Sequence, residues 1–311
     1  MPFWGWIIIA VVLLLIAAVL FISYQFAKMV LRPNTHDNEF LLNEAYEFKR
    51  FTPEYIASLN TEDIIIPSKY GYDMHGLILR SEKSELEENR NRIAVLCHGY
   101  TSSKIVMSGY AGILLKMGFT CIMYDHRNHG DNAKNVNTTM GYYEREDLKT
   151  VIDWIYERFG PDVRIITYGE SMGSAIVLSH LEIDDRPVLT IADCGYSDLV
   201  DLFKYLLKGV YHMPVWPILP IAEIMLKIGG HFDPKDVSPR RGVIKTKIPI
   251  LFCHGDQDTF VPTFMSVEMS KLGEGVRELY LCPGAIHAQS YSIDPVKYSE
   301  VVTSFITKYY K

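Results

Sequence analysis

"RIITYGESMG", residues Arg164–Gly173, is the stretch that decides the fold. A run rich in β-branched and aromatic residues, which favour strands, ends at Gly169. Ser171 follows, and the residues after Gly173 read "SAIVLSHLE", a pattern that predicts a helix. A sharp strand-to-helix turn leaves no room for large side chains two positions before and after its central residue, which accounts for both glycines. The stretch therefore predicts an exposed serine between a buried strand and a helix.

Strands and helices alternate on both sides of this turn. Apolar runs predict strands within residues 92–100, 119–127, 163–169, 187–195, 248–255 and 277–284, and helical periodicity lies between them and after them, as at 143–160 and 294–311. Fully apolar strands that alternate with helices indicate a mostly parallel sheet with helices on both faces, and a hairpin within 62–80 precedes it. Ligands bind such sheets at the carboxyl ends of the strands, where His98, Asp125 and Ser171 are expected.

One insertion and one linker interrupt this pattern. Residues 196–235 are too long for a crossover and rich in Leu, Ile, Met and Trp, so we expect a small cap of two or three short helices. Residues 32–60 are polar and predict a linker with one or two short helices. The expected organisation is an N-terminal segment (1–31), this linker (32–60), and one α/β body (61–311) that carries the cap.

The N-terminal segment has the composition of a membrane anchor. Residues 3–27 contain no charge, and about 20 apolar residues suffice to span a bilayer. No Lys or Arg precedes residue 28, whereas a signal peptide normally begins with basic residues, so we expect an uncleaved single-pass anchor, with a signal peptide as the alternative. Because Lys28 and Arg32 follow the span, the positive-inside rule places the protein in the cell membrane with its body in the cytoplasm.

Composition excludes other classes of function. The formal net charge is −6, and no long cluster of Lys and Arg supplies the basic footprint that nucleic-acid binding needs. The five cysteines, Cys97 among them, have no zinc-site or CxxC spacing and are expected to be small buried hydrophobes. We expect no metal and no other cofactor.

A serine needs a base and an acid to become a nucleophile, and the chain offers both in a usable order. "CHGDQDTFVP" places Asp256 and Asp258 directly after one predicted strand, and "CPGAIHAQS" places His287 directly after the next. The order serine, acid, histidine is the one that a triad on a strand-to-helix turn requires. All three loops are expected at the same edge of the sheet.

These segments resemble the α/β-hydrolase family from about Asp63 to the carboxyl end, and within it bacterial members with a membrane anchor or signal and a short helical cap. "LCHGYTSSK" is similar to the family's His-Gly oxyanion loop, and "YDHRNHG" to its Asp-x-Arg-x-x-Gly loop. "GESMG" matches the nucleophile elbow, and "HGDQDTFVP" and "GAIHA" resemble the acid and histidine loops. The resemblance implies the α/β-hydrolase fold and a serine hydrolase.

It also implies roles for single residues. Ser171 is the expected nucleophile, His287 the general base and then the acid, and Asp258, rather than Asp256, the carboxylate that orients His287. The expected oxyanion donors are the backbone N–H groups of Met172 and Tyr100, with Thr101 as the alternative to Tyr100.

The remaining polar candidates have structural interpretations. His126, His129 and Asp131 match no metal-site spacing and are expected to brace loops through hydrogen bonds. Asp193 is expected to support the histidine loop from the end of its strand. Glu170, beside the nucleophile, is expected to be structural.

The expected function is hydrolysis of carboxylic esters with an apolar acyl or alcohol part, through an acyl-enzyme. The substrate is a small-molecule or lipid ester met at the bilayer, and the apolar surplus of the cap either packs beneath it or lines an acyl pocket. Two alternatives stay open: a peptidase or amidase with the same triad, and a non-catalytic binding module on the same fold.

Overall fold

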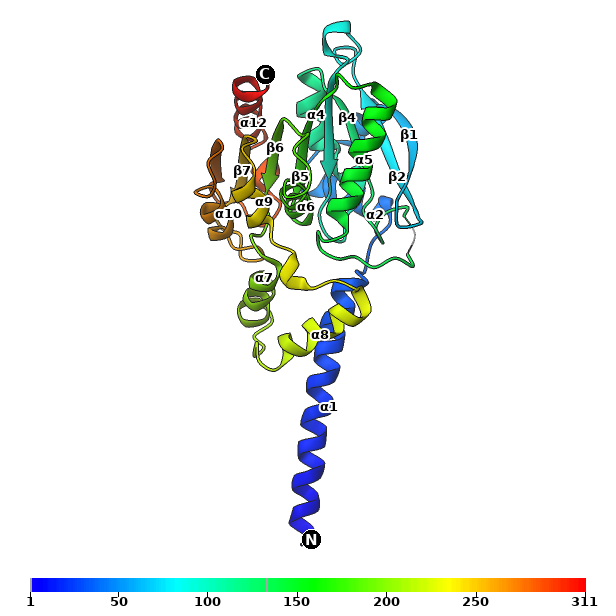
Figure 1. Cartoon of the computed structure of the whole chain (residues 1–311). Coiled ribbons are helices and arrows are strands. Elements are labelled where there is room, and N and C mark those ends of the chain that lie inside the picture. Colours follow the sequence, from blue (N-terminus) through cyan, green and yellow to red (C-terminus); the bar gives the residue numbers. More distant parts are fainter. Residues whose placement is uncertain (1, 133) are drawn as a thin grey trace.

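The computed structural model describes residues 2–132 and 134–311, and its centre is one eight-stranded sheet (Figure 1). The strand order is β1-β2-β4-β3-β5-β6-β7-β8. β1 and β2 form the expected antiparallel hairpin, β2 also pairs antiparallel with β4, and all other pairs are parallel. The strands are β1 (Asn60–Pro67), β2 (Asp73–Arg80), β3 (Arg92–Cys97), β4 (Thr120–Tyr124), β5 (Arg164–Glu170), β6 (Leu189–Asp193), β7 (Ile250–Gly255) and β8 (Arg277–Cys282).

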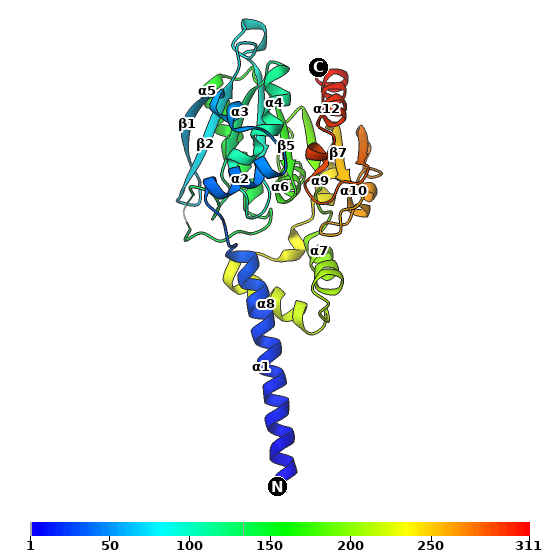
Figure 2. The same cartoon turned by 180° about the vertical axis from the view of Figure 1, so that it is seen from behind.

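Helices cover both faces of the sheet, as the apolar strands predict. Neighbouring residues of β3 enter different cores: Ile93 and Val95 pack with α5 and α6, whereas Ala94 and Leu96 pack with α4 and α12. Figures 1 and 2 show these two layers from opposite sides. The helices of the body are α4 (Ser108–Lys116), α5 (Glu144–Phe159), α6 (Met172–His180), α9 (Pro239–Lys245), α10 (Phe264–Met269), α11 (Ser290–Ile293) and α12 (Pro295–Tyr309).

The insertion between β6 and β7 forms the small helical cap that its composition predicts. It contains α7 (Leu199–Tyr205), a π-helical turn (Leu206–Val210) and α8 (Ile218–Gly230). Pro214 and Pro217 precede α8, where a proline ends a preceding helix without disturbing the next one. Both cap helices lie at the end of the body from which the N-terminal helix projects (Figures 1 and 2).

The N-terminal helix α1 (Phe3–Leu31) has two parts. Its outer part is mostly exposed and extends away from the body (Figure 1). Its inner part buries Ser23, Phe26, Ala27 and Val30, whose spacing places them on one helix face against the cap. The body therefore begins near residue 23, inside the segment expected to be the anchor.

The outer part of α1 satisfies the physical requirements of a membrane span. Residues 3–22 of this helix are about 30 Å long, which matches the thickness of about 30 Å of the hydrocarbon core of a bilayer. By length and composition α1 is able to cross a membrane, and a signal sequence has the same properties.

The linker forms two short helices, as expected, and both contact the body. α2 (Asn38–Glu47) begins at Asp37, whose carboxylate accepts a hydrogen bond from the Phe40 N–H at 2.8 Å. α3 (Pro53–Ala57) is joined to the body by Tyr55, whose hydroxyl donates to the Ser108 carbonyl at 3.0 Å. Residues 32–60 are thus packed structure rather than a free tether.

Candidate active site

The turn at Ser171 has the strained geometry that the two glycines predict. Ser171 lies between β5 and α6 with φ 54° and ψ −114°, a region that non-glycine residues rarely occupy. A Cβ atom at Gly169 would lie 2.2 Å from the Gly173 carbonyl oxygen, and one at Gly173 would lie 2.0 Å from the Cys97 carbonyl oxygen. Any side chain at either position would force β5, α6 and β3 apart.

Ser171, His287 and Asp258 meet at the carboxyl edge of the sheet. Ser171 Oγ lies 2.9 Å from His287 Nε2, and His287 Nδ1 lies 2.7 Å from Asp258 Oδ2. The loops after β7 and β8 supply the acid and the histidine, in the order that the sequence predicts. With Nδ1 protonated, His287 donates to Asp258 and leaves Nε2 free to accept the Ser171 hydroxyl proton.

Asp258 is held ionised by four donors. Its Oδ1 accepts the N–H groups of Phe260 and Val261, both at 2.9 Å, and its Oδ2 accepts from His287 and from His254 Nε2 at 3.0 Å. Burial opposes ionisation, but the hydrogen bonds from His254 and His287 outweigh it and lower the pKa of Asp258 to about 2. Sequence reasoning missed His254, whose only signal is its place at the end of a strand in the acid motif.

Asp256, the alternative acid, has a different task. It is exposed, and its Oδ1 accepts the Gly284 N–H at 2.7 Å, which closes the turn after β8. Its carboxylate has no contact with His287 among the described hydrogen bonds and ion pairs.

The backbone N–H groups of Tyr100 and Met172, beside Ser171, have no partner within the described part of the chain. The Ser171 N–H is taken by the Asp193 carbonyl at 2.8 Å, and the Thr101 N–H donates to His129 Nε2 at 3.1 Å. The alternative donor Thr101 is therefore occupied, whereas both residues expected as oxyanion donors keep a free N–H.

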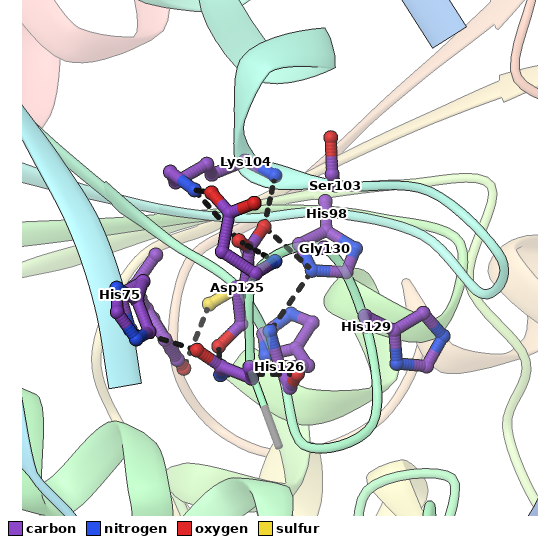
Figure 3. A network of polar contacts seen from close by, with 12 residues as sticks. His75, His98, Ser103, Lys104, Asp125, His126, His129 and Gly130 are labelled. Atoms are coloured by element: carbon purple, nitrogen blue, oxygen red, sulfur yellow. Dashed lines mark hydrogen bonds and ion pairs between the residues drawn. The ribbon is translucent and has the colours of Figure 1, made fainter. Parts of the chain in front are cut away.

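Figure 3 shows the polar network that holds the loop after β3, which carries Tyr100. Asp125, directly after β4, accepts from the Lys104 N–H at 2.8 Å and from Lys104 Nζ at 2.7 Å (Figure 3). It also accepts from the Asp131 N–H at 2.9 Å. Lys104 Nζ also reaches Asp131 at 2.5 Å. The loops after β3 and β4 are thereby locked to each other.

Three histidines complete this network, and all are buried. His98 Nε2 accepts the His126 N–H at 3.0 Å, and His129 Nδ1 donates to the Arg127 carbonyl at 2.8 Å (Figure 3 shows all three rings). Burial lowers the pKa of His98 and of His129 to about 3, so both rings are neutral at physiological pH. His129 and Asp131 brace loops as expected; the His126 ring instead packs against His98, with 4.2 Å between ring centroids.

Glu170 joins the active site to the linker. Its Oε2 accepts from Arg50 Nη1 at 2.7 Å and from the Tyr110 hydroxyl at 2.6 Å. Arg50 Nη2 also donates to the Ala288 carbonyl at 2.7 Å, directly after His287. Glu170 thus has the structural role expected of it. Its ion-pair partner Arg50 lies 120 positions away, so no local sequence pattern could predict the pair.

Asp193 does not support the histidine loop with its side chain, contrary to expectation. Its carboxyl accepts from the Tyr298 hydroxyl at 2.8 Å, and Tyr110 lies 3.5 Å away. Burial, followed by the charge of Glu170, raises the pKa of Asp193 to about 7. Its link to the active site is its backbone carbonyl, which accepts the Ser171 N–H.

Ser171 stands between two pockets of different character. On one side is an apolar cavity of about 80 Å³, lined among others by Phe26, Val30, Met172, Leu202 and Phe203. On the other side is a more polar pocket of about 270 Å³ that His36, Glu44, Arg50, Glu170 and His287 help to line. A larger hollow of about 1030 Å³ beside α4 and α12 does not include Ser171.

Comparison with known proteins agrees with this architecture. The family model described as "Serine aminopeptidase, S33" matches residues 88–192, which include β3, the elbow and β6. An uncharacterized protein of Bacillus subtilis, YqkD, is 29% identical over 294 residues, which cover 94% of each chain.

Solved structures are similar in fold. The esterase Pf2001 of Pyrococcus furiosus superposes with a TM-score of 0.64 at 22% identity, over 83% of this chain and 96% of that one. Est1E of Butyrivibrio proteoclasticus, solved with ferulic acid bound, gives 0.61 at 18% identity, over 79% and 98%. The acylaminoacyl peptidase of Pyrococcus horikoshii gives 0.61 at 15% identity, over 81% of this chain and 42% of that one. The sheet order and the solved neighbours give the chain the α/β-hydrolase fold, and the family match over residues 88–192 supports a serine hydrolase.

Proposed function

We propose that the chain hydrolyses carboxylic esters through a triad of Ser171, His287 and Asp258. The observation that carries the proposal is the continuous contact from Ser171 Oγ through both nitrogens of His287 to the Asp258 carboxylate, at 2.9 and 2.7 Å. A hydroxyl, a base and an orienting carboxylate in this arrangement make up an activated nucleophile.

The reaction proceeds in two halves. His287 Nε2 takes the hydroxyl proton as Ser171 Oγ attacks the ester carbonyl, and the same proton passes to the leaving alkoxide as the C–O bond breaks. An acyl-enzyme at Ser171 remains. Water, deprotonated by His287, then attacks this acyl group, releases the carboxylic acid and restores the serine. Asp258 stays ionised throughout and stabilises the imidazolium.

The N–H groups of Tyr100 and Met172 are proposed to receive the negative charge that develops on the carbonyl oxygen. Both are free of partners within the described residues, and Met172 opens α6, where unpaired N–H groups carry a partial positive charge. Donors that are already oriented before the reaction stabilise the tetrahedral intermediate at no cost of reorganisation.

The two pockets support an ester with an apolar acyl group. Cap and α1 residues surround the apolar cavity at Ser171, so an acyl chain there would leave water, while the alcohol part would lie in the polar pocket. The apolar surplus of the cap thus has an acyl-binding use, in addition to packing.

The proposed place of action is the surface of the cell membrane. Residues 3–22 would span the bilayer once, and the basic Lys28 and Arg32 favour a body on the cytoplasmic side. α8 packs beside α1 and leaves Ile224 and Ile228 57% and 71% exposed, so the cap offers apolar side chains next to the anchor. An amphiphilic or lipid ester at the interface would reach the site directly.

Hydrolysis of p-nitrophenyl esters, compared with p-nitroanilides of the same acyl groups, tests the proposal. We expect ester turnover that falls on the order of a millionfold in Ser171→Ala, as in a comparable serine enzyme. Ser304→Ala, an exposed serine on α12, is the matched control. Faster anilide than ester turnover would favour the amidase alternative; wild-type inactivity on both would favour the binding module.

A further inference from the structure

The inner end of α1 forms part of the cavity at Ser171. Phe26, Met29 and Val30 contribute to its lining, opposite the cap residues Leu202 and Leu206. The helix expected to act only as an anchor therefore supplies one wall of the space in which we place the acyl group.

This wall is fixed to the cap. The Phe26 ring packs edge-to-face on Phe203 of α7, with ring centroids 5.0 Å apart. Ser23 Oγ donates to the Ile218 carbonyl at the start of α8, at 3.1 Å. Leu31 packs closely on Gly230: a Cβ atom at position 230 would lie 2.7 Å from Leu31 Cδ2. These contacts hold the inner end of α1 in one position.

The wall is also tied to the oxyanion loop. The Tyr100 hydroxyl donates to the Met29 carbonyl, one of the last carbonyls of α1, which have no partner within the helix. Tyr100 is the residue whose backbone N–H is proposed to bind the oxyanion. The Thr138 N–H, at 3.1 Å, caps the Leu31 carbonyl in the same way.

We propose that the inner end of α1, through Phe26, determines which acyl-chain lengths the enzyme accepts; this inference rests on the proposed ester hydrolysis. A cavity of about 150 Å³ is known to hold benzene, so the cavity of about 80 Å³ has room for roughly three or four carbons. The preferred substrate class is esters of short acyl chains. Each methylene that fits contributes roughly a fourfold gain in kcat/KM, and further methylenes contribute little once the wall is reached.

The experiment uses the full chain in detergent micelles and p-nitrophenyl esters of two to ten acyl carbons. Phe26→Ala enlarges the cavity, and Phe26→Trp fills it. Phe21→Ala and Phe21→Trp are the matched controls, because Phe21 lies on the same helix but is 63% exposed. Each kcat/KM is divided by that of the acetate ester. The acetyl group is too short to reach the inner end of α1, so turnover of this ester measures the activity of the triad alone.

For the wild type we expect a rise from acetate until the three or four carbons that the cavity can hold are in place, and then a plateau. Phe26→Ala should extend the rise by about two carbons, so that the octanoate-to-butanoate ratio grows roughly 10-fold or more. Phe26→Trp should lower the same ratio below the wild-type value, and both Phe21 variants should keep the wild-type profile. If Phe26→Ala does not fold, Phe26→Trp, which removes no packing, decides the outcome.

The inference would be overturned if folded Phe26 variants kept the wild-type chain-length profile, or if Phe21 and Phe26 variants changed it equally. In both cases turnover of the acetate ester would still support the proposed function. Absence of acetate turnover in the wild type would overturn the proposed function itself, and this inference with it.

Discussion

Replacement of Arg50 by methionine should destabilise the protein strongly, although Arg50 comes from the linker. Its guanidinium lies 2.7 Å from the Glu170 carboxylate, and the two side chains are only 11% and 5% exposed. Arg50→Met leaves Glu170 buried and without its counter-charge. Breaking a buried ion pair from one side costs about 3–5 kcal/mol, because the remaining charge stays desolvated.

The neutral pair provides the control. In the double variant Arg50→Met/Glu170→Gln no buried charge remains, and the glutamine oxygen can still accept from Tyr110. We therefore expect the double variant to recover at least half of the stability that Arg50→Met loses, since neutral replacements of buried pairs are often well tolerated.

The test compares the wild type, Arg50→Met, Glu170→Gln and the double variant in a double-mutant cycle. The free energy of unfolding of all four proteins is measured by thermal and chemical unfolding in the same detergent. At about 2–4 °C per kcal/mol, the Arg50→Met variant should unfold roughly 6–20 °C below the wild type. A loss of less than about 1 kcal/mol, or a double variant as unstable as the sum of the two single ones, would refute the account of this ion pair.

Three further outcomes follow from the site. Asp258→Asn should lower kcat/KM roughly ten-thousandfold, because it disturbs the tautomer of His287, whereas Asp256→Asn should lower it far less. Equal losses in the two variants would show that the assignment of Asp258 as the orienting carboxylate is wrong. The pKa of Asp193 is raised to about 7 in the folded protein, against about 3.9 in the unfolded chain. Between these two pH values the folded state holds a proton that the unfolded state releases, so the folded protein becomes less stable as the pH rises from about 4 to 7. The stability of Asp193→Asn relative to the wild type should therefore rise between about pH 4 and pH 7, and a pH-independent difference would contradict that pKa. Deletion of residues 2–20 should preserve the acyl-chain profile in detergent, whereas deletion of residues 2–33 should abolish it, as ester assays of both proteins would show.

Much of the fold was predictable because its signals are local. β5 ends at Glu170, the next helix begins after Ser171, and the clash distances at Gly169 and Gly173 show why only glycine fits on both sides of this sharp turn. The hairpin, the alternating apolar strands and the proline-interrupted cap are likewise encoded within single segments. The resemblance to a family then singled out Asp258, which local pattern alone left level with Asp256.

What the sequence did not reveal depends on contacts between distant segments. The pairing of Arg50 with Glu170, 120 positions apart, leaves no pattern in the sequence. His254 lies only four positions before Asp258, but their contact depends on how the loop after β7 folds back. The inner end of α1 is less apolar than its outer part, but Phe26 and Ala27 continue the uncharged run, so the sequence did not show that this turn packs against the body. Packing against the cap decides that boundary.

Labelling with a fluorophosphonate tests the central claim most directly. The account predicts one covalent adduct per chain, located by peptide mass spectrometry on Ser171, since Ser171 is the hydroxyl held 2.9 Å from an imidazole nitrogen that Asp258 orients. Labelling should disappear in Ser171→Ala and persist in Ser304→Ala. An adduct on another residue, or ester turnover that continues after Ser171 has been replaced, would contradict it.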